Sequence, residues 1–280
     1  MSDSFTQPQK KVSLGYKIAF GFGMLANQMY PAALGVFIIV LVQDLGFAAI
    51  LWGILQFAPR VVDAITDPVM GFISDNTRSK WGRRRQYVLI GGIIICISYI
   101  AMWQLYEENG VMYNFIYFLS WSLVFYLGLT IFSVPYLALG YEISDDFHER
   151  TQIMAISQFI GQWAWVIAPW FWVILYDPKW FPEGAAQGVR DLSVWVAIPC
   201  SLFAIIPALF IKSKSTVDRT DFLPINARYI GKSISNIFKS AFESFKIKSF
   251  RQIAGATFLI FNSFNITGAF TFLIIVHYLF

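Results

Sequence analysis

Charged residues are scarce in this sequence, and their scarcity argues against an ordinary water-soluble domain. Only 14% of the 280 residues are charged, whereas 57% are hydrophobic and 18% are aromatic. A soluble domain usually carries about 25% charged residues. Because about 20 consecutive apolar residues cross the hydrocarbon core of a bilayer, the sequence predicts an all-α membrane protein that crosses the bilayer several times.

Cysteine and histidine are scarcer still, with two of each in the chain. Cys96 and Cys200 fall in different apolar segments and are predicted to be buried thiols rather than a disulfide. His148 has no partner motif beside it, and the sequence shows neither zinc-ligand spacing nor a phosphate-binding glycine loop. The sequence therefore favours a protein that is not an enzyme and has no organic cofactor.

Positive charge is almost missing from one set of loops. These are the loops that follow the first, third and fifth apolar segments. Of the 21 lysines and arginines, only Lys179 and Arg190 lie in them, and Arg60 lies within an apolar segment. Because cytoplasmic loops are enriched in Lys and Arg, we expect a multi-pass protein of the plasma (inner) membrane with a cytoplasmic N-terminus. The basic clusters flank apolar segments and form no folded basic face, so the lipid bilayer is an expected partner and nucleic acid is not.

Six long apolar segments precede a polar stretch and a seventh apolar segment. Helices are predicted at residues 15–42, 47–75, 87–106, 111–143, 151–176 and 192–211. We expect an N-terminal six-helix transmembrane bundle over 1–211, a cytoplasmic middle loop over 212–249 and a seventh transmembrane helix over 250–280. A single helix after a group of six indicates the start of a truncated C-terminal bundle, so the missing half of a longer protein is another expected partner.

The middle loop carries its own pattern. Apolar residues between Ile230 and Phe245 recur three and four positions apart, and lysines fill other positions. This spacing predicts an amphipathic helix on the membrane surface. A disordered linker is the alternative.

Three charges interrupt the second apolar segment. Arg60, Asp63 and Asp67 share one face of a helix, and each costs at least about 2.5–3.5 kcal/mol at mid-membrane depth. Two carboxylates about 6 Å apart repel by roughly 3 kcal/mol at an effective dielectric constant of about 20. Both stay ionised only beside a cation, which is Arg60, a proton or a bound ion. The pattern favours a coupling-ion site for Na⁺ or H⁺, to which Thr66 adds a hydroxyl; a structural pair neutralised by Arg60 is the alternative.

A basic loop follows this segment. Asp75 ends the apolar run, and Arg83 and Arg84 lie just before the next one. Two interpretations of the arginines are open. Either they serve only to set the membrane topology, or they form a gate on the cytoplasmic side by pairing with helix ends. We include Arg150, in the next loop on the same side, among the candidate gate residues.

Polar side chains also occur at mid-membrane depth in the first, fourth and fifth segments. Each must find a partner in hydrocarbon, and hydrogen bonds between helices explain any one of them. Their clustering favours a shared cavity that binds a small-molecule substrate. The candidate substrate-binding residues are Gln28, Tyr30, Ser133, Tyr136, Gln158 and Gln162.

Two long motifs carry a resemblance to a known family. DAITDPVMGFISDNTRSKWGRRR at residues 63–85 and VPYLALGYEISDDFHERT at residues 134–151 resemble signatures of the glycoside–pentoside–hexuronide:cation symporters, a melibiose-permease-like family of the major facilitator superfamily. The resemblance implies that this chain corresponds to the first seven of the family's twelve helices. It also implies symport of a sugar or glycoside, coupled to a cation by alternating access.

The same resemblance implies a cation site at Asp63 and Asp67, with Thr66 in place of an asparagine and with Thr130. The family's charged sugar-site positions fall on neutral residues here, namely Gln28, Ser133 and Gln158. An amphiphile such as a lysophospholipid is therefore the alternative substrate. A membrane sensor or assembly factor that transports nothing is a further alternative.

Overall fold

The computed structural model describes residues 11–211, 215–217 and 222–274. Within them the regular structure is entirely helical, which confirms the predicted all-α class. The chain forms two compact units, and Ile225 ends the first. Several predictions concern residues outside the described ranges: the basic residues Lys10, Lys212, Lys214 and Arg219, and the last six residues of the seventh apolar segment.

The first unit contains six long helices and one short 3₁₀ turn. Their bounds are α1 Leu14–Gln43, α2 Ala49–Asp75, α3 Arg85–Met102, η1 Glu107–Asn109, α4 Val111–Glu142, α5 Phe147–Leu175 and α6 Ala185–Phe210. Of the described helices, α1, α3, α4, α5 and α6 are long and apolar enough to cross a membrane. Helix α2 is of similar length but carries the three charges. The protein is a multi-pass membrane protein.

Two helices begin at least four residues earlier than predicted. Helix α5 starts at Phe147 because the Asp146 side chain accepts a hydrogen bond from the backbone N–H of His148 and so caps the helix. Residues 147–150, expected in a loop, therefore form its first turn. Helix α6 starts at Ala185, seven residues before the predicted start, directly after Gly184, whose φ of 102° favours glycine.

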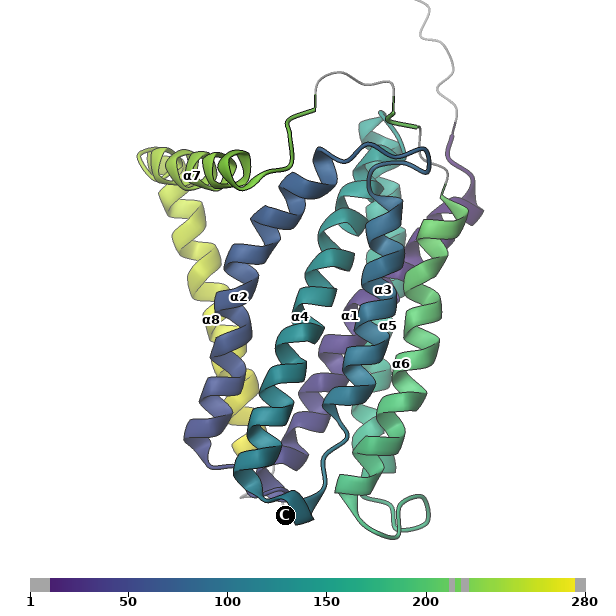
Figure 1. Ribbon diagram of the computed structural model, residues 1–280, viewed down its shortest axis with the longest axis vertical. Helices are drawn as coiled ribbons and strands as arrows, with labels where there is room; N and C mark the ends of the chain where they lie inside the picture. The colour runs from purple at the N-terminus through teal and green to yellow at the C-terminus, as the bar shows by residue number, and fades with distance from the viewer. Residues whose placement is uncertain (1–10, 212–214, 218–221, 275–280) are drawn as a thin grey trace, which may run out of the picture. The chain divides into compact units, whose positions relative to one another are not determined.

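The helices of the first unit pack in a connected set. Helix α1 packs against α5 and α6, α3 packs against α4 and α6, and α2 packs mainly against α4, as Figure 1 shows for the neighbours α2 and α4. Aromatic side chains fill the interior: Tyr30 lies edge-on to Tyr99 and Phe125, with ring centroids 5.1 and 5.9 Å apart. The packing leaves α2, with its two acids, on one side of the bundle.

Close contact between α3 and α4 depends on Gly91. A Cβ atom at Gly91 would lie 2.5 Å from the backbone nitrogen of Phe132 and 2.7 Å from its Cα. Such an approach between helix backbones is possible only for a residue without a side chain.

Gly91→Ala is therefore expected to destabilise the protein by about 1–3 kcal/mol, because the α4 backbone must move to admit the methyl group. Gly35→Ala is the matched control, since nothing lies within 4 Å of its added Cβ. The control is expected to be neutral or stabilised by up to about 1 kcal/mol, as Ala has the higher helix propensity. Thermal unfolding of both variants in detergent checks this; equal midpoints would contradict the close contact.

The second unit contains α7, Ala227–Ser244, and α8, Lys248–Ile274. The side chain of Asn226 accepts a hydrogen bond of 3.0 Å from the Tyr229 backbone N–H and caps α7. Residues 227–244 of the predicted middle loop are therefore helical in this structure.

Candidate functional site

Asp63 and Asp67, on α2, lie on the side of the helix that packs beside α4. Thr130, on α4, is only 3% exposed, and its hydroxyl donates a hydrogen bond of 2.7 Å to Asp67 Oδ1. The oxygen atoms of Thr130 and Thr66 are 3.4 Å apart. Asp63 lies one helical turn before Asp67. The structure thus brings three of the four predicted cation-site residues together, and the fourth lies next to them on α2.

The hydroxyl hydrogens of the two threonines are already used in hydrogen bonds. The Thr66 hydroxyl donates its one hydrogen to Val62 O at 3.1 Å, and Thr130 donates its own to Asp67. Lone pairs of both hydroxyl oxygens therefore remain available beside a carboxylate. Pro68, in the same turn, has no N–H to donate to the Ala64 carbonyl. Oxygen-rich surroundings of this kind suit a hard cation or a proton.

Arg60 contributes only at the edge of this group. Its nearest guanidinium nitrogen is 3.7 Å from Asp63 Oδ2, and its side chain is 71% exposed. Its guanidinium carbon lies 5.7 Å from the centre of the Tyr126 ring. Among the ion pairs of the described residues none involves Asp67. Arg60 therefore approaches one of the two acids and leaves the other without a cationic partner in the described part of the chain.

The predicted substrate residues are divided between two environments. Gln28 is partly exposed and accepts a hydrogen bond of 3.1 Å from the Trp165 indole, which joins α1 to α5. Gln158 and Gln162 are exposed on α5, one turn apart, and Ser133 is partly exposed on α4. These four side chains remain candidates for contact with a substrate.

Tyr30 and Tyr136, in contrast, lie in the interior of the bundle. The Tyr30 hydroxyl is 2.6 Å from Ser201 Oγ and 3.0 Å from Ala197 O on α6. The Tyr136 hydroxyl donates a hydrogen bond of 2.5 Å to Phe20 O on α1. Both side chains are at most 1% exposed, so in this structure their hydroxyls join helices. This differs from the accessible cavity wall on which the sequence placed them.

Near the α2–α3 loop, a network of charges joins α2, the loop and the end of α4. Asp75 Oδ1 is 2.5 Å from an Arg84 guanidinium nitrogen. The other terminal nitrogen of Arg84 is 3.3 Å from Glu142 Oε1 and donates to Ala138 O at 2.5 Å. Arg83 also pairs with Glu142. The sequence identified Asp75 and the arginines but missed Glu142, for which the only signal was its place in the second family motif.

Two further networks hold helix ends. The Arg85 guanidinium donates hydrogen bonds of 2.7 and 3.1 Å to the carbonyls of Ala208 and Leu209, the last turn of α6. This is a cationic cap on a helix C-terminus. The Lys17 ammonium is 2.9 Å from Glu149 Oε2, where both side chains are less than 10% exposed. That ion pair joins the first turns of α1 and α5.

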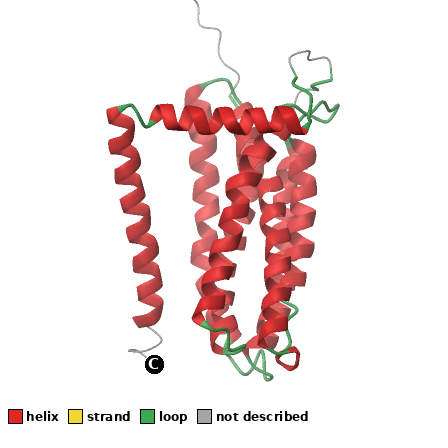
Figure 2. Cartoon of the chain, turned by 60° about the vertical axis from the view of Figure 1, so that its left-hand side comes forward, coloured by secondary structure: helices red, strands yellow, loops and turns green. Residues whose placement is uncertain are grey.

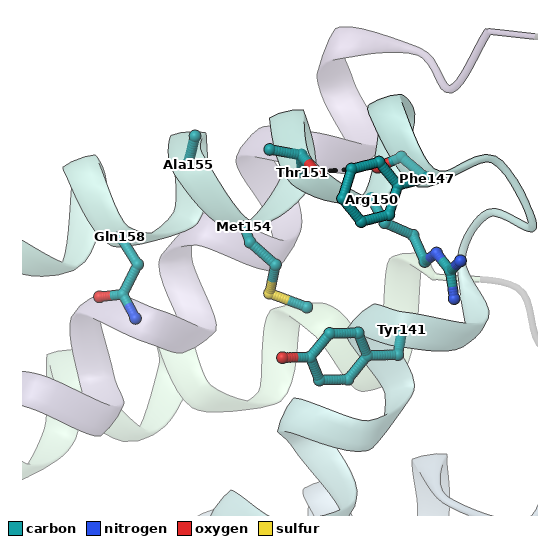
Figure 3. Close-up of a pocket in the computed structure, with 7 residues that line it drawn as sticks. All are labelled: Tyr141, Phe147, Arg150, Thr151, Met154, Ala155 and Gln158. Atoms are coloured by element: carbon teal, nitrogen blue, oxygen red, sulfur yellow. Dashed lines mark hydrogen bonds between the residues drawn. The ribbon is translucent and has the colours of Figure 1, made fainter. Parts of the chain in front are cut away.

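Arg150 lies apart from the charge network and lines a pocket of about 550 Å³ between the end of α4 and α5. Figure 3 shows Arg150 and Gln158 at opposite ends of this pocket, with Met154 between them. The pocket therefore connects a candidate gate residue with a candidate substrate residue. Its lining residues are Tyr141, Phe147, Arg150, Thr151, Met154, Ala155 and Gln158.

Comparison with known proteins identifies related chains. The family model described as MFS/sugar transport protein matches residues 19–241. An uncharacterized symporter of Synechocystis sp. is 31% identical over 153 residues, 51% of this chain and 28% of its own length. A lactose permease of Leuconostoc lactis is 24% identical over 259 residues, 85% of this chain and 39% of its own length.

A third relative is a sodium-dependent lysophosphatidylcholine symporter of Xenopus tropicalis, which is 33% identical over 146 residues. The match covers 50% of this chain and 27% of that relative. The chain thus spans well under half the length of these curated relatives. Since the family match covers most of the chain and agrees with the two motifs, the chain belongs to the MFS/sugar transport protein family, and to the glycoside–pentoside–hexuronide:cation symporters of the major facilitator superfamily.

Proposed function

We propose that the full-length protein is a cation-coupled symporter of a sugar or glycoside that works by alternating access. It lies in the plasma membrane, with the N-terminus and the α2–α3 loop on the cytoplasmic side. The C-terminal half of the full-length protein supplies the second wall of the transport cavity. The proposal rests on one observation above all: Asp67 is bonded to Thr130 and has no cationic partner among the described residues.

Ion binding has a direct consequence at this site. A Na⁺ ion or a proton at Asp67 and Asp63 removes the repulsion between the two carboxylates and lowers the cost of closing the cavity over them. The ion therefore favours the state that binds substrate, and substrate favours ion binding to the same extent. Thr66 and Thr130 complete the ion's oxygen ligands, or hold the carboxylate that accepts the proton.

Uptake by the full-length protein in inverted and right-side-out vesicles tests the proposal. A panel of sugars and glycosides is offered with an imposed Na⁺ gradient, an imposed H⁺ gradient or neither. We expect accumulation of at least one sugar under one of the two gradients. The absence of substrate-dependent ion flux under every condition would instead favour a sensor or assembly factor.

An amphiphile is the second candidate substrate. The pocket between α4 and α5 is lined mostly by apolar side chains such as Phe147 and Met154 and carries one cation, Arg150. That combination suits an apolar chain with an anionic or zwitterionic headgroup, and one relative is named as a lysophosphatidylcholine symporter. Inhibition of cation-driven uptake by lysolipid, with no competition by sugars, would favour this candidate.

Thr130 offers a specific test of the cation site. Thr130→Val keeps the side-chain shape but removes the hydrogen bond to Asp67, which as a bond to a charged group contributes about 1.5–3 kcal/mol. We expect the cation concentration for half-maximal uptake to rise about tenfold or more. Thr130→Ser retains the hydroxyl and is expected to stay within about threefold of wild type, since a few tenths of a kcal/mol of packing is lost. Equal cation dependence in both variants would remove Thr130 from the site.

A further inference from the structure

Helix α7 presents an uncovered apolar edge, which consists of Ile237, Phe238 and Phe242. Phe238 and Phe242, one turn apart, are 65% and 73% exposed, and Ile237 is 46% exposed. Apolar surface of this size on one helix normally marks a contact with a membrane or another molecule.

A narrow row of positive charge runs along this edge. At 100° per residue, Arg228, Lys232 and Lys239 fall within roughly 40° of one another on the helix, next to Phe242. We call these three residues the basic row. The opposite flank of α7 carries uncharged Ser233, Asn236 and Ser240, and Glu243 is the only acid of the helix. Positive charge therefore lies on one border of the apolar edge and not around the whole polar face.

The corner between α7 and α8 sets the orientation of α7. Only three residues separate the two helices, and the rings of Phe245 and Phe250 meet edge to face with centroids 5.3 Å apart. Within this second unit, α7 runs crosswise to α8 (Figure 2). When α8 crosses a bilayer, α7 consequently lies along the surface at the depth of the lipid headgroups.

We propose that α7 binds anionic lipid headgroups. The side chains of Phe238 and Phe242 enter the boundary between headgroups and acyl chains, the basic row contacts lipid phosphates, and the Ser-rich flank faces water. The complementary charge comes from the lipids: α7 offers three cations against one acid. This interaction does not depend on transport, because it requires only that α8 crosses the membrane.

Site-specific fluorescence in nanodiscs tests the occupant of the apolar edge. The chain is purified in a Cys96→Ala/Cys200→Ala background and labelled with bimane at Phe242→Cys or, as a control on the opposite flank, at Asn236→Cys. Discs contain phosphatidylcholine alone or equal parts of phosphatidylcholine and phosphatidylglycerol. Quenching by a doxyl-labelled lipid reports contact with acyl chains, and quenching by iodide reports contact with water.

We expect the label at position 242 to be quenched by doxyl lipid in the phosphatidylglycerol discs, and the label at position 236 to be quenched by iodide. Position 242 protected from both quenchers would mean that protein covers the edge. Iodide quenching at both positions would mean that α7 stays in water. Either result would overturn the proposal, as would equal doxyl quenching in the two kinds of disc.

Charge variants test the basic row itself. Each Lys or Arg near an anionic surface strengthens binding about fivefold, so Arg228→Gln/Lys232→Gln/Lys239→Gln is expected to lower the ratio of bound to unbound α7 about 100-fold. The control Ser233→Glu/Asn236→Glu/Ser240→Glu lowers net charge by the same amount on the water-facing flank. It is expected to have a much smaller effect; an equal effect would show that net charge, and not the basic row, governs binding.

Discussion

Asp67→Asn in the full-length protein is expected to abolish cation-driven accumulation of substrate. Asparagine preserves size and still accepts the hydrogen bond from Thr130, but it removes the negative charge that binds a cation or takes up a proton. A coupling ion then has no differential affinity for the two states of the transporter, and without that difference its gradient drives nothing. Uptake of labelled substrate under imposed Na⁺ and H⁺ gradients, corrected for the amount of protein in the membrane, measures the effect.

Asp63→Asn is expected to have the same outcome by a different route. Arg60 lies 3.7 Å from Asp63, so its charge loses its ion-pair partner when Asp63 is neutral, and an unpaired cation at the edge of the site disfavours binding of the coupling ion. Double replacement of Arg60 and Asp63 by glutamines is then expected to recover ion binding at Asp67 in part.

Exchange of substrate across the membrane without a gradient separates loss of coupling from loss of folding. A neutral side chain mimics the protonated acid, so we expect exchange to survive in Asp67→Asn. Glu108→Gln, an exposed acid in η1, serves as the control and should transport normally. Wild-type accumulation under either gradient in both Asp63→Asn and Asp67→Asn would refute the proposed coupling site.

Arg84→Gln is expected to lower the stability of the purified chain by about 1–3 kcal/mol. The Arg84 side chain is 10% exposed and contacts Asp75, Glu142 and the carbonyl of Ala138. Its removal leaves the Ala138 carbonyl and Asp75 without this cationic partner, whereas Glu142 keeps its ion pair with Arg83. Most of the loss comes from the Ala138 carbonyl, because Asp75 is half exposed, water screens its ion pair, and Glu142 retains Arg83. Thermal and denaturant unfolding in detergent measure the change.

Arg150→Gln is the matched control, since its side chain makes no ion pair in the described part of the structure. We expect it to be within about 0.5 kcal/mol of wild type in stability, as is usual for surface substitutions. If Arg84→Gln and Arg150→Gln had equal stability, the charge network near the α2–α3 loop would not hold the helix ends together. Altered uptake by Arg150→Gln at wild-type stability would point to the pocket that it lines.

The sequence by itself determined the class of fold and the family. Apolar segments of about 20 residues can satisfy their backbone only as helices in a bilayer, so composition and segment length predicted the six long helices of the first unit, with most of their ends within two residues and the largest errors at the end of α3 and the starts of α5 and α6. Those errors arose where local contacts decide, as at α5, where the Asp146 side chain caps a helix in a stretch that sequence placed in a loop.

The partners of the polar side chains were decided by tertiary structure. Tyr30 and Gln28 lie two residues apart on α1, yet the hydroxyl of one is buried against α6 and the amide of the other faces α5. Likewise, Thr130 meets Asp67, and Glu142 meets Arg84, only because α4 packs beside α2 and the α2–α3 loop. The physical reason is that helical periodicity fixes which residues share a face, whereas the neighbour of each face depends on how separate helices pack.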